Sequence, residues 1–326
     1  MEIKIILGYN KKDWGEDVKI YIDSSILKSR FNIIAEAYSN HEITDKVDES
    51  FDALGIIVYP NYVIKENIEK YKNLKWIQIF SAGFNTIDLD YLRENNIVLT
   101  NAKDVYNKPI AEDVITKILT FNRNVNKYYE NMKTSLWKRY NNEYELTSST
   151  VGIIGVGSIG LEIAKRLKGF ETKIIGYRRK PNKEEYFDEI FTGEEGLNKL
   201  LNESDYVVIA LPLNKETYGM INLEKLKLMK KEALLINIAR GEIVNQDDLI
   251  YALENNLIRG AALDVLVSEP LPIDNKLWKM DNVFITPHNS FSSPYTINRL
   301  VDLLINNIKR FVNDEKLLNI VDLGGK

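Results

Sequence analysis

Short apolar runs alternate with segments of helical spacing along most of this chain. Residues 53–59 and 74–80 are typical of buried strands, and residues 62–71 between them have a spacing compatible with a helix. The chain also opens on a strand-like run at residues 3–7. Because strands joined by helices form parallel sheets, this pattern predicts a first α/β unit.

Beyond residue 150 the same alternation continues through six further apolar runs. Helical patterns separate most of these runs, which predicts a second, doubly wound parallel sheet. The predicted strands are residues 151–155, 173–177, 206–211, 233–238, 261–265 and 283–286.

Two amphipathic helices complete the predicted elements. The first starts at Pro109, a residue suited to the first helical position, and leads into an Asn- and Lys-rich stretch that ends at Asn142. We expect that stretch to be exposed or to lie at an interface. The second follows Ser293, as N-cap, and Pro294. Apolar side chains recur at spacings of three and four over residues 297–311, so this helix must pack on another element.

Length and composition place the chain among globular proteins. A chain of 326 residues is longer than one ordinary core requires, so we expect two domains, joined by tight crossings near Asn101 and Phe291. Hydrophobic residues make up 44% and charged residues 28% of the chain, proportions that exclude a disordered chain, a collagen-like fibre and a coiled coil.

Charge and cysteine content exclude several kinds of partner and site. The net charge of −4 offers no basic field for nucleic acid or an anionic membrane. Cysteine is absent, which excludes disulfides, thiolate metal sites and a cysteine nucleophile, and we expect no metal in the site. Neither a leader segment nor an apolar stretch of about 18 residues is recognisable, so we expect a cytoplasmic protein.

The chain has two histidines, and histidine is the side chain that most readily changes charge near neutral pH. His41 lies in a polar stretch and is interpreted as a solvated loop residue without a role. His288 follows Pro287 and the apolar run 283–286, just past the end of a predicted strand. Open α/β sheets bind ligands at the carboxyl ends of their strands, so His288 is the candidate acid or base.

A glycine-rich segment, Gly155-Val156-Gly157-Ser158-Ile159-Gly160, follows one predicted strand and opens a helix. The GxGxxG pattern alone is a weak signal, because a structural turn also uses glycine. Between a strand and a helix, Gly155 permits a tight turn, Gly157 lets the backbone approach a pyrophosphate, and Gly160 allows close helix packing. The helix N-terminus then faces the phosphates, so we expect Ser158 and Ile159 to belong to a dinucleotide site.

The residues about twenty positions further along bear on which dinucleotide binds. An NAD site would show Asp or Glu there for the ribose hydroxyls. This strand instead ends Gly176-Tyr177-Arg178-Arg179-Lys180, and we expect no carboxylate to be available. A cationic cluster suits a 2′-phosphate, although the same residues are also compatible with a solvated basic turn. The sequence favours NADP(H), with NAD(H) as the alternative.

Arg240, Glu269 and His288 each follow a predicted strand, so a parallel sheet brings all three to its carboxyl edge. Reduction of a 2-oxo acid requires a hydride, a proton for the carbonyl oxygen and a cation for the carboxylate. Arginine suits the last task and histidine the second, and a neighbouring carboxylate stabilises and orients the protonated histidine. Each residue alone has an ordinary structural explanation. Together with the glycine-rich segment, they predict a dehydrogenase.

An ordered series of motifs over most of the chain resembles the D-2-hydroxyacid dehydrogenase family. The motifs lie at residues 81–88, 110–112, 151–160, 211–213 with Thr217, 237–241, 263–265, 269–270 and 287–288. The resemblance implies an α/β fold of two doubly wound parallel-sheet lobes with a cleft that closes between them. A Rossmann dinucleotide-binding domain, residues 101–290, is inserted in a flavodoxin-like substrate-binding domain, residues 1–100 plus 291–326. It also implies a homodimer formed through the helix and arm at residues 109–142.

The same resemblance implies roles for individual residues. Arg240 would bind the substrate's carboxylate and carbonyl, His288 would be the acid/base, and Glu269 its partner. The backbone around Ala82 and Gly83 would receive the carboxylate. Further cofactor contacts would come from Tyr177, Arg178, Arg179, Leu211, Pro212, Thr217, Ile238, Ala239, Ser290 and Asp264, the last touching the nicotinamide carboxamide. Tyr59, Phe84 and Phe291 are candidates to line the substrate pocket, and their alternative role is ordinary core packing.

The chain departs from the family pattern at three places. Asp113 stands where many relatives have histidine, a position that we do not expect to touch the chemistry. The end of the strand at residues 177–179 resembles the NADP-type members. Asn289, Ser290 and Phe291 replace small residues, which leaves the shape of the pocket wall open.

Three alternative functions have to be considered. Formate dehydrogenases carry glutamine at the position of Glu269, so Glu269 argues against that function. Phosphoglycerate dehydrogenases often carry a further regulatory domain, and we expect no room for one after the helix that ends near residue 312. Corepressor relatives bind dinucleotide as a sensor and can retain all three catalytic-type residues, so that function stays open. The sequence does not distinguish glyoxylate, hydroxypyruvate, pyruvate and bulkier 2-oxo acids as substrates.

Overall fold

The computed structural model describes residues 18–25, 27, 30–46 and 51–324. The chain divides into two compact units, one made of residues 1–106 and 293–326 and the other of residues 107–292. The first unit therefore contains both ends of the chain. The strand-like run at residues 3–7 lies outside the described residues.

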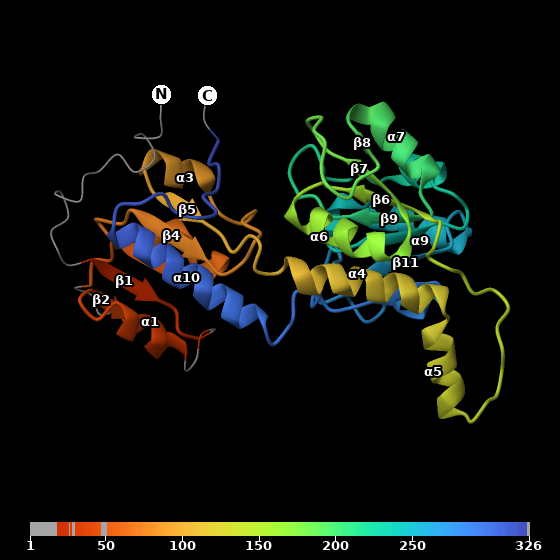
Figure 1. Ribbon diagram of the computed structural model, residues 1–326, viewed down its shortest axis with the longest axis horizontal. Helices are drawn as coiled ribbons and strands as arrows, with labels where there is room; N and C mark the ends of the chain where they lie inside the picture. Colours follow the sequence, from red (N-terminus) through yellow and green to blue (C-terminus); the bar gives the residue numbers. More distant parts are fainter. Residues whose placement is uncertain (1–17, 26, 28–29, 47–50, 325–326) are drawn as a thin grey trace. The chain divides into compact units, whose positions relative to one another are not determined.

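Five parallel strands form the sheet of the first unit, in the order β2-β1-β3-β4-β5 (Figure 1). This is the flavodoxin-like order of a doubly wound fold. The strands are β1 Lys19–Ile22, β2 Glu42–Thr44, β3 Gly55–Val58, β4 Trp76–Ile79 and β5 Val98–Thr100. The helices of this unit are α1 Phe31–Ala37, α2 Lys65–Ile68, α3 Leu89–Glu94 and α10 Thr296–Val312. The strands predicted at residues 53–59 and 74–80 are confirmed as β3 and β4.

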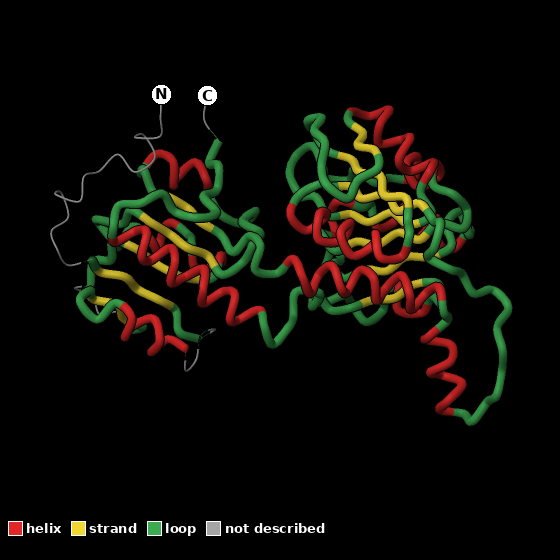
Figure 2. The backbone as a smooth tube through the Cα atoms, in the orientation of Figure 1, coloured by secondary structure: helices red, strands yellow, loops and turns green. Residues whose placement is uncertain are grey.

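The C-terminal helix α10 packs on this sheet (Figure 2). Leu300, Leu304 and Ile308 are buried on one side of the helix, and the Phe311 ring centroid lies 4.9 Å from that of Trp76 on β4. Full burial of each such side chain stabilises the fold by about 1.5–3 kcal/mol. The prediction that this one-sided helix must pack on another element is confirmed.

Two helix boundaries in the first unit differ from the prediction. Helix α10 begins at Thr296, because Ser293 closes a turn ahead of it, with its carbonyl accepting from the Thr296 N–H, so Ser293 is not the N-cap. The helix expected over residues 62–71 is limited to α2, since a 3₁₀ turn at Pro60–Tyr62 precedes it and Asn67 donates its side-chain N–H to the Tyr62 carbonyl.

Seven parallel strands form the sheet of the second unit, in the order β12-β11-β10-β9-β6-β7-β8 (Figure 1). Numbered from β6, this is the Rossmann order 3-2-1-4-5-6 with one strand added. The strands are β6 Thr150–Ile154, β7 Lys173–Tyr177, β8 Glu189–Phe191, β9 Tyr206–Ile209, β10 Leu234–Asn237, β11 Gly260–Leu263 and β12 Val283–Ile285. All six strands predicted beyond residue 150 are confirmed, and β8 is an additional short edge strand.

Helices cover both faces of the second sheet, and α4 packs against α6 while α8 contacts α7 and α9. These helices are α4 Asn107–Asn122, α5 Val125–Lys133, α6 Ser158–Leu167, α7 Gly193–Glu203, α8 Leu223–Leu228 and α9 Gln246–Glu254. Helix α4 starts two residues before Pro109, which was predicted as its first residue. Among the helices of the described ranges, we find none with the length and hydrophobicity needed to cross a bilayer.

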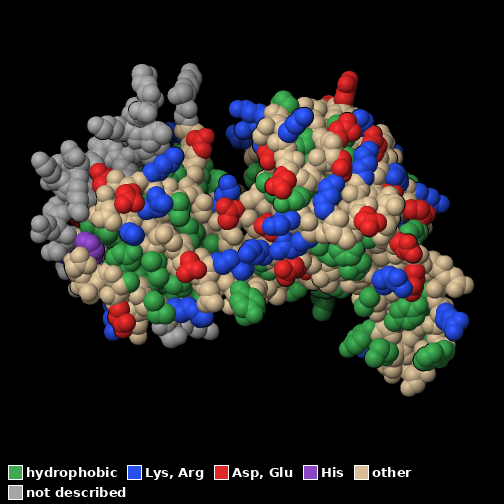
Figure 3. Space-filling view, in the orientation of Figure 1, with side chains coloured by type: hydrophobic (Ala, Val, Ile, Leu, Met, Phe, Trp, Pro, Cys, Tyr) green, Lys and Arg blue, Asp and Glu red, His purple; other side chains and the backbone are tan. Residues whose placement is uncertain are grey.

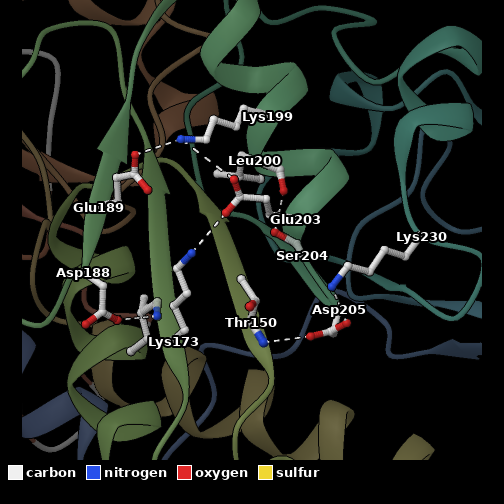
Figure 4. Close-up of polar contacts among 11 residues, drawn as sticks. Thr150, Lys173, Asp188, Glu189, Lys199, Leu200, Glu203, Ser204, Asp205 and Lys230 are labelled. Carbon is white, nitrogen blue, oxygen red and sulfur yellow. Dashed lines mark hydrogen bonds and ion pairs between the residues drawn. The ribbon is translucent and has the colours of Figure 1, made fainter.

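Acidic side chains anchor the amino-terminal edge of the second sheet (Figure 4). Asp205 accepts the backbone N–H of Thr150 at 2.8 Å, and Asp188 accepts that of Ile174 at 2.6 Å. Partial burial opposes ionisation of Asp188, but hydrogen bonds from Ile174 and from Lys168 hold the pKa of its carboxyl below the ordinary value. These contacts fix the strand starts, and the carboxyl ends at the opposite edge remain for ligands.

Candidate active site

The glycine-rich segment forms the turn between β6 and α6. Gly155 has φ +114°, and a Cβ there would lie 2.6 Å from the backbone of Ala210 and Leu211. A Cβ on Gly160 would collide with the Gly155 carbonyl oxygen, whereas a Cβ on Gly157 would have no heavy atom within 4 Å. Two of the glycines therefore permit close backbone packing, and the third leaves open space over the turn.

This turn lies at the point where the strand order reverses. From β6 the chain continues to β7 and β8 on one side, and then to β9 and the remaining strands on the other. Ligands of doubly wound sheets bind in the crevice at such a point. In the described structure no side chain caps the N-terminus of α6, so its first backbone N–H groups, which include those of Ser158 and Ile159, suit an anion.

The loop after β9 borders the same crevice and is held by its own hydrogen bonds. Thr217 donates its hydroxyl to the Pro212 carbonyl at 2.8 Å and accepts the Asn214 N–H at 2.8 Å. Leu211 is buried beside the Gly155 turn. The structure thus brings together two segments that the sequence assigned to the dinucleotide.

The end of β7 differs from the prediction. Arg178 lies 2.5 Å from Glu184, whose carboxylate also accepts from the Asn182 side chain at 3.2 Å. The expectation that no carboxylate is available there is wrong, because the chain folds back after β7 and returns Glu184 to the strand end. Arg179 and Lys180 are exposed. The dinucleotide end therefore contains both a cationic cluster and an acid.

His288 and Glu269 meet at the carboxyl edge of the second sheet. His288 Nδ1 lies 2.7 Å from Glu269 Oε2, and Glu269 Oε1 accepts the backbone N–H of Leu266 at 2.9 Å. The described part of the chain offers no hydrogen-bond partner for the other ring nitrogen, Nε2, and the imidazole is partly exposed. The carboxylate therefore orients the ring and leaves Nε2 for a ligand.

Asp264, at the end of β11, holds the loop that carries His288. Its carboxylate accepts from the Thr286 hydroxyl at 2.5 Å and from the backbone N–H groups of Asn289 at 3.0 Å and Ser290 at 3.2 Å. Burial opposes its ionisation, but the hydrogen bonds from Ser290 and Thr286 hold the pKa of this carboxyl below its ordinary value. His288 adopts a left-handed conformation, φ +49°, with its N–H donated to the Asp264 carbonyl. The loop is thus held by its backbone N–H groups and by the Thr286 hydroxyl.

Arg240 follows β10 and borders the loop that leads to Glu269. Asn237 donates its side-chain N–H to the Arg240 carbonyl at 2.9 Å, and a Cβ on Gly241 would collide with the backbone of Leu266. One guanidinium nitrogen donates to the Ala239 carbonyl at 2.6 Å, and the side chain is only partly buried. The remaining N–H groups suit a ligand carboxylate. Ile238 and Ala239 are buried beside it.

The predicted carboxylate-binding segment lies in the first unit, after β4. The Ala82 carbonyl accepts from Asn101 at 2.7 Å, and the Gly83 carbonyl accepts from the Ser81 hydroxyl at 2.6 Å. Within the described residues neither Ala82 nor Gly83 donates its backbone N–H. Both carbonyl oxygens thus accept hydrogen bonds within the protein, whereas the two backbone N–H groups remain available to donate to an anion. Tyr59 is partly exposed and packs edge-to-face on Phe80, with ring centroids 5.3 Å apart.

Sequence reasoning missed a buried ion pair in the second unit. Lys117 of α4 is fully buried and pairs with Asp113 one turn earlier. Burial raises the pKa of Asp113, and Lys117 opposes that shift. The charge of Lys117 also favours the ionised form of Asp264. A lysine in the apolar stripe of Val114 and Ile118 was the signal that could have revealed it.

The second histidine also differs from its interpretation. His41 immediately precedes β2 and is half-buried, with its Nδ1 atom buried and no described hydrogen-bond partner for that atom. It is therefore not a fully solvated loop residue.

Comparison with known proteins identifies the family. Residues 115–290, more than half of the chain, match the family model described as D-isomer specific 2-hydroxyacid dehydrogenase, NAD binding domain. The glyoxylate reductase of Pyrococcus horikoshii is 37% identical over 282 residues, which cover 84% of this chain and 84% of the relative. The alternative functions are not favoured by these matches.

Solved structures agree in fold over nearly the whole chain. The NADPH-dependent glyoxylate/hydroxypyruvate reductase of Sinorhizobium meliloti superposes with a TM-score of 0.80 at 25% identity, covering 94% of this chain and 98% of that one. The D-lactate dehydrogenase of Lactobacillus jensenii, solved with NAD+, gives a TM-score of 0.77 at 26% identity, covering 94% and 100%. The chain described here belongs to the D-isomer specific 2-hydroxyacid dehydrogenase family.

Proposed function

We propose that this enzyme reduces a small 2-oxo acid to the D-2-hydroxy acid with NADPH as the preferred reductant. The observation that carries the proposal is the His288–Glu269 pair, 2.7 Å apart at the sheet edge that also bears Arg240 and the glycine-rich turn. The glyoxylate reductases among the relatives make glyoxylate the first substrate to test.

Each residue of the site has one task in this reaction. When bound, the nicotinamide supplies the hydride that is added to the carbonyl carbon. His288 Nε2 delivers a proton to the carbonyl oxygen, while Glu269 holds the Nδ1–H and stabilises the imidazolium before transfer. Arg240 holds the substrate's carboxylate and carbonyl through parallel N–H groups. The 2-oxo acid, NADPH and one proton thereby become the 2-hydroxy acid and NADP+.

We assign the dinucleotide to the second unit. The uncapped N-terminus of α6 and the open space above Gly157 fit a pyrophosphate, with Ser158 and Ile159 supplying backbone N–H groups. Asp264 accepts a hydrogen bond from the carboxamide N–H of the nicotinamide. In the first unit, the backbone N–H groups of Ala82 and Gly83 are proposed to bind a carboxylate.

The preference for NADPH rests on the cationic end of β7. Arg178, Arg179 and Lys180 place three positive charges at the end of this strand, beside the acid Glu184. NADH is retained as a second cofactor, because Glu184 lies against Arg178. A cytoplasmic location is also part of the proposal.

A homodimer is part of the proposal. Hydrophobic side chains gather on α5 and the segment after it (Figure 3), with 58% of Tyr129, 75% of Met132 and 94% of Trp137 exposed. Exposed apolar area of this kind marks an interaction surface. Sedimentation equilibrium is expected to give twice the mass of the chain, and a monomer at micromolar concentration would refute this part.

The experiment that tests the function is an initial-rate assay of dinucleotide oxidation with glyoxylate, hydroxypyruvate, pyruvate and a bulkier 2-oxo acid. We expect turnover with at least one small 2-oxo acid, a higher kcat/KM with NADPH than with NADH, and a D product where the product is chiral. Tight dinucleotide binding without turnover of any of these acids would contradict the proposal and favour a sensor.

A further inference from the structure

Glu184 forms an ion pair with the guanidinium of Arg178, the group that would bind the 2′-phosphate in the proposed NADPH site. The Arg178 Nη1 atom lies 2.5 Å from Glu184 Oε1, and both side chains are mostly shielded from solvent, with 28% and 24% exposed. Asn182 donates to the same carboxylate oxygen at 3.2 Å, which holds Glu184 against Arg178. Partial burial reduces screening, so this pair is stronger than a fully exposed one.

The ion pair of Arg178 and Glu184 lies at the end of β7, where the adenosine ribose of a dinucleotide would bind. Arg178 directly follows β7, the neighbour of β6, and its backbone N–H is held by the Phe191 carbonyl at 3.1 Å. An acid at the end of this strand suits the ribose hydroxyls of NAD, because a carboxylate accepts hydrogen bonds from them. The same acid repels a 2′-phosphate and competes with it for the guanidinium.

We infer that Glu184 sets the cofactor selectivity of this enzyme by competing with the 2′-phosphate of NADPH for Arg178. The inference rests on the proposed dinucleotide site. A 2′-phosphate takes over the guanidinium only when Glu184 releases it, whereas NADH leaves the pair in place and donates its 2′-hydroxyl to the carboxylate. Glu184 therefore lowers NADPH affinity and supports NADH binding, and it keeps the enzyme able to use both.

The test is a calorimetric titration of the full-length protein with adenosine 2′,5′-bisphosphate and with adenosine 5′-phosphate, which differ only in the 2′-phosphate. Glu184→Gln is expected to bind the bisphosphate about tenfold more tightly than the parent, with the monophosphate unchanged or weaker. Glu185→Gln is the matched control, because it removes the same charge from the adjacent, exposed position. It is expected to leave the ratio of the two affinities within about twofold.

A second comparison tests whether the effect of Glu184 on affinity depends on Arg178. In an Arg178→Ala background, Glu184→Gln is expected to lose most of its gain, because the guanidinium for which the groups compete is absent. An equal gain in both backgrounds would overturn the competition, and so would a parent-like affinity ratio in Glu184→Gln. These outcomes are independent of turnover. Failure of every 2-oxo acid in the rate assay would refute the proposed function and leave the selectivity result standing.

Discussion

His288 Nδ1 lies 2.7 Å from Glu269 Oε2, and the other oxygen of that carboxylate is fixed by the Leu266 backbone N–H. The carboxylate therefore has a defined orientation before any substrate arrives. The same geometry directs the imidazole so that Nε2 is the nitrogen left for a ligand. In the proposed reaction this nitrogen gives its proton to the carbonyl oxygen, and the Glu269 carboxylate holds the ring in place for that step.

Glu269→Gln keeps the shape of the side chain and removes its charge. The ring of His288 then loses the negative charge beside its Nδ1 atom, so reductive kcat/KM is expected to fall by roughly 10-fold or more. The measurement is the initial rate of 2-oxo acid reduction by NADPH, with Glu195→Gln on the exposed face of α7 as the charge-matched control. A parent-like kcat/KM in Glu269→Gln would show that Glu269 does not assist the histidine.

Arg240→Lys tests the proposed contact between Arg240 and the substrate's carboxylate. An ammonium cannot reproduce two parallel N–H bonds, so kcat/KM for the 2-oxo acid is expected to fall by roughly 10- to 100-fold. The Kd of NADPH, measured by fluorescence titration, is expected to stay within about twofold of the parent. If NADPH affinity fell as much as substrate affinity, Arg240 would belong to the dinucleotide site instead.

The buried pair of Asp113 and Lys117 gives a stability prediction. Asp113→Asn leaves the fully buried Lys117 ammonium without its partner, which is expected to lower the free energy of unfolding by about 3–5 kcal/mol. The double variant Asp113→Leu, Lys117→Met removes both charges and is expected to recover most of the loss. Urea unfolding followed by circular dichroism provides both values. A double variant no more stable than Asp113→Asn would mean that the charge itself is needed.

Asp188 provides a pH-dependent contribution at the amino edge of the sheet. Hydrogen bonds from Ile174 and Lys168 outweigh partial burial and place the folded-state pKa of this carboxyl below its unfolded value. Its stabilisation is therefore fully present above the unfolded pKa of about 3.9 and is lost as pH falls through the lower folded value. Asp188→Asn is expected to be less stable than the parent at pH 7 and to approach it in the most acidic buffers that preserve folding. A stability difference independent of pH would exclude this role.

The strands were the part of the fold that the sequence predicted best. Continuous apolar runs such as residues 206–211 are typical of buried strands in a chain with this alternation, and all six predicted beyond residue 150 are present. Short, half-buried edge strands such as β2 and β8 carry three residues each, too few for a periodic signal. The starts of α4 and α10 were misplaced because a proline near a helix start does not specify which residue begins the helix.

Residues of the candidate site that directly follow a strand could be placed from the sequence. A residue that an irregular loop brings back to a strand end could not. Arg240, Glu269 and His288 could be placed at one edge because the carboxyl ends of parallel strands share it. Glu184 could not be placed, since its return to Arg178 depends on the path of an irregular loop. Lys117 was overlooked because a single lysine does not disturb the apolar periodicity of α4.

The most direct test of the account is the effect of His288→Ala on reduction of glyoxylate by NADPH, compared with His41→Ala, which removes the other histidine of the chain. We expect His288→Ala to lower kcat by roughly 10²–10⁴, with NADPH affinity and the thermal melting temperature near those of the parent. His41→Ala is expected to retain the parent's kcat. A folded, NADPH-binding His288→Ala variant that reduces glyoxylate at a rate close to the parent's would contradict the assignment of His288 as the proton donor.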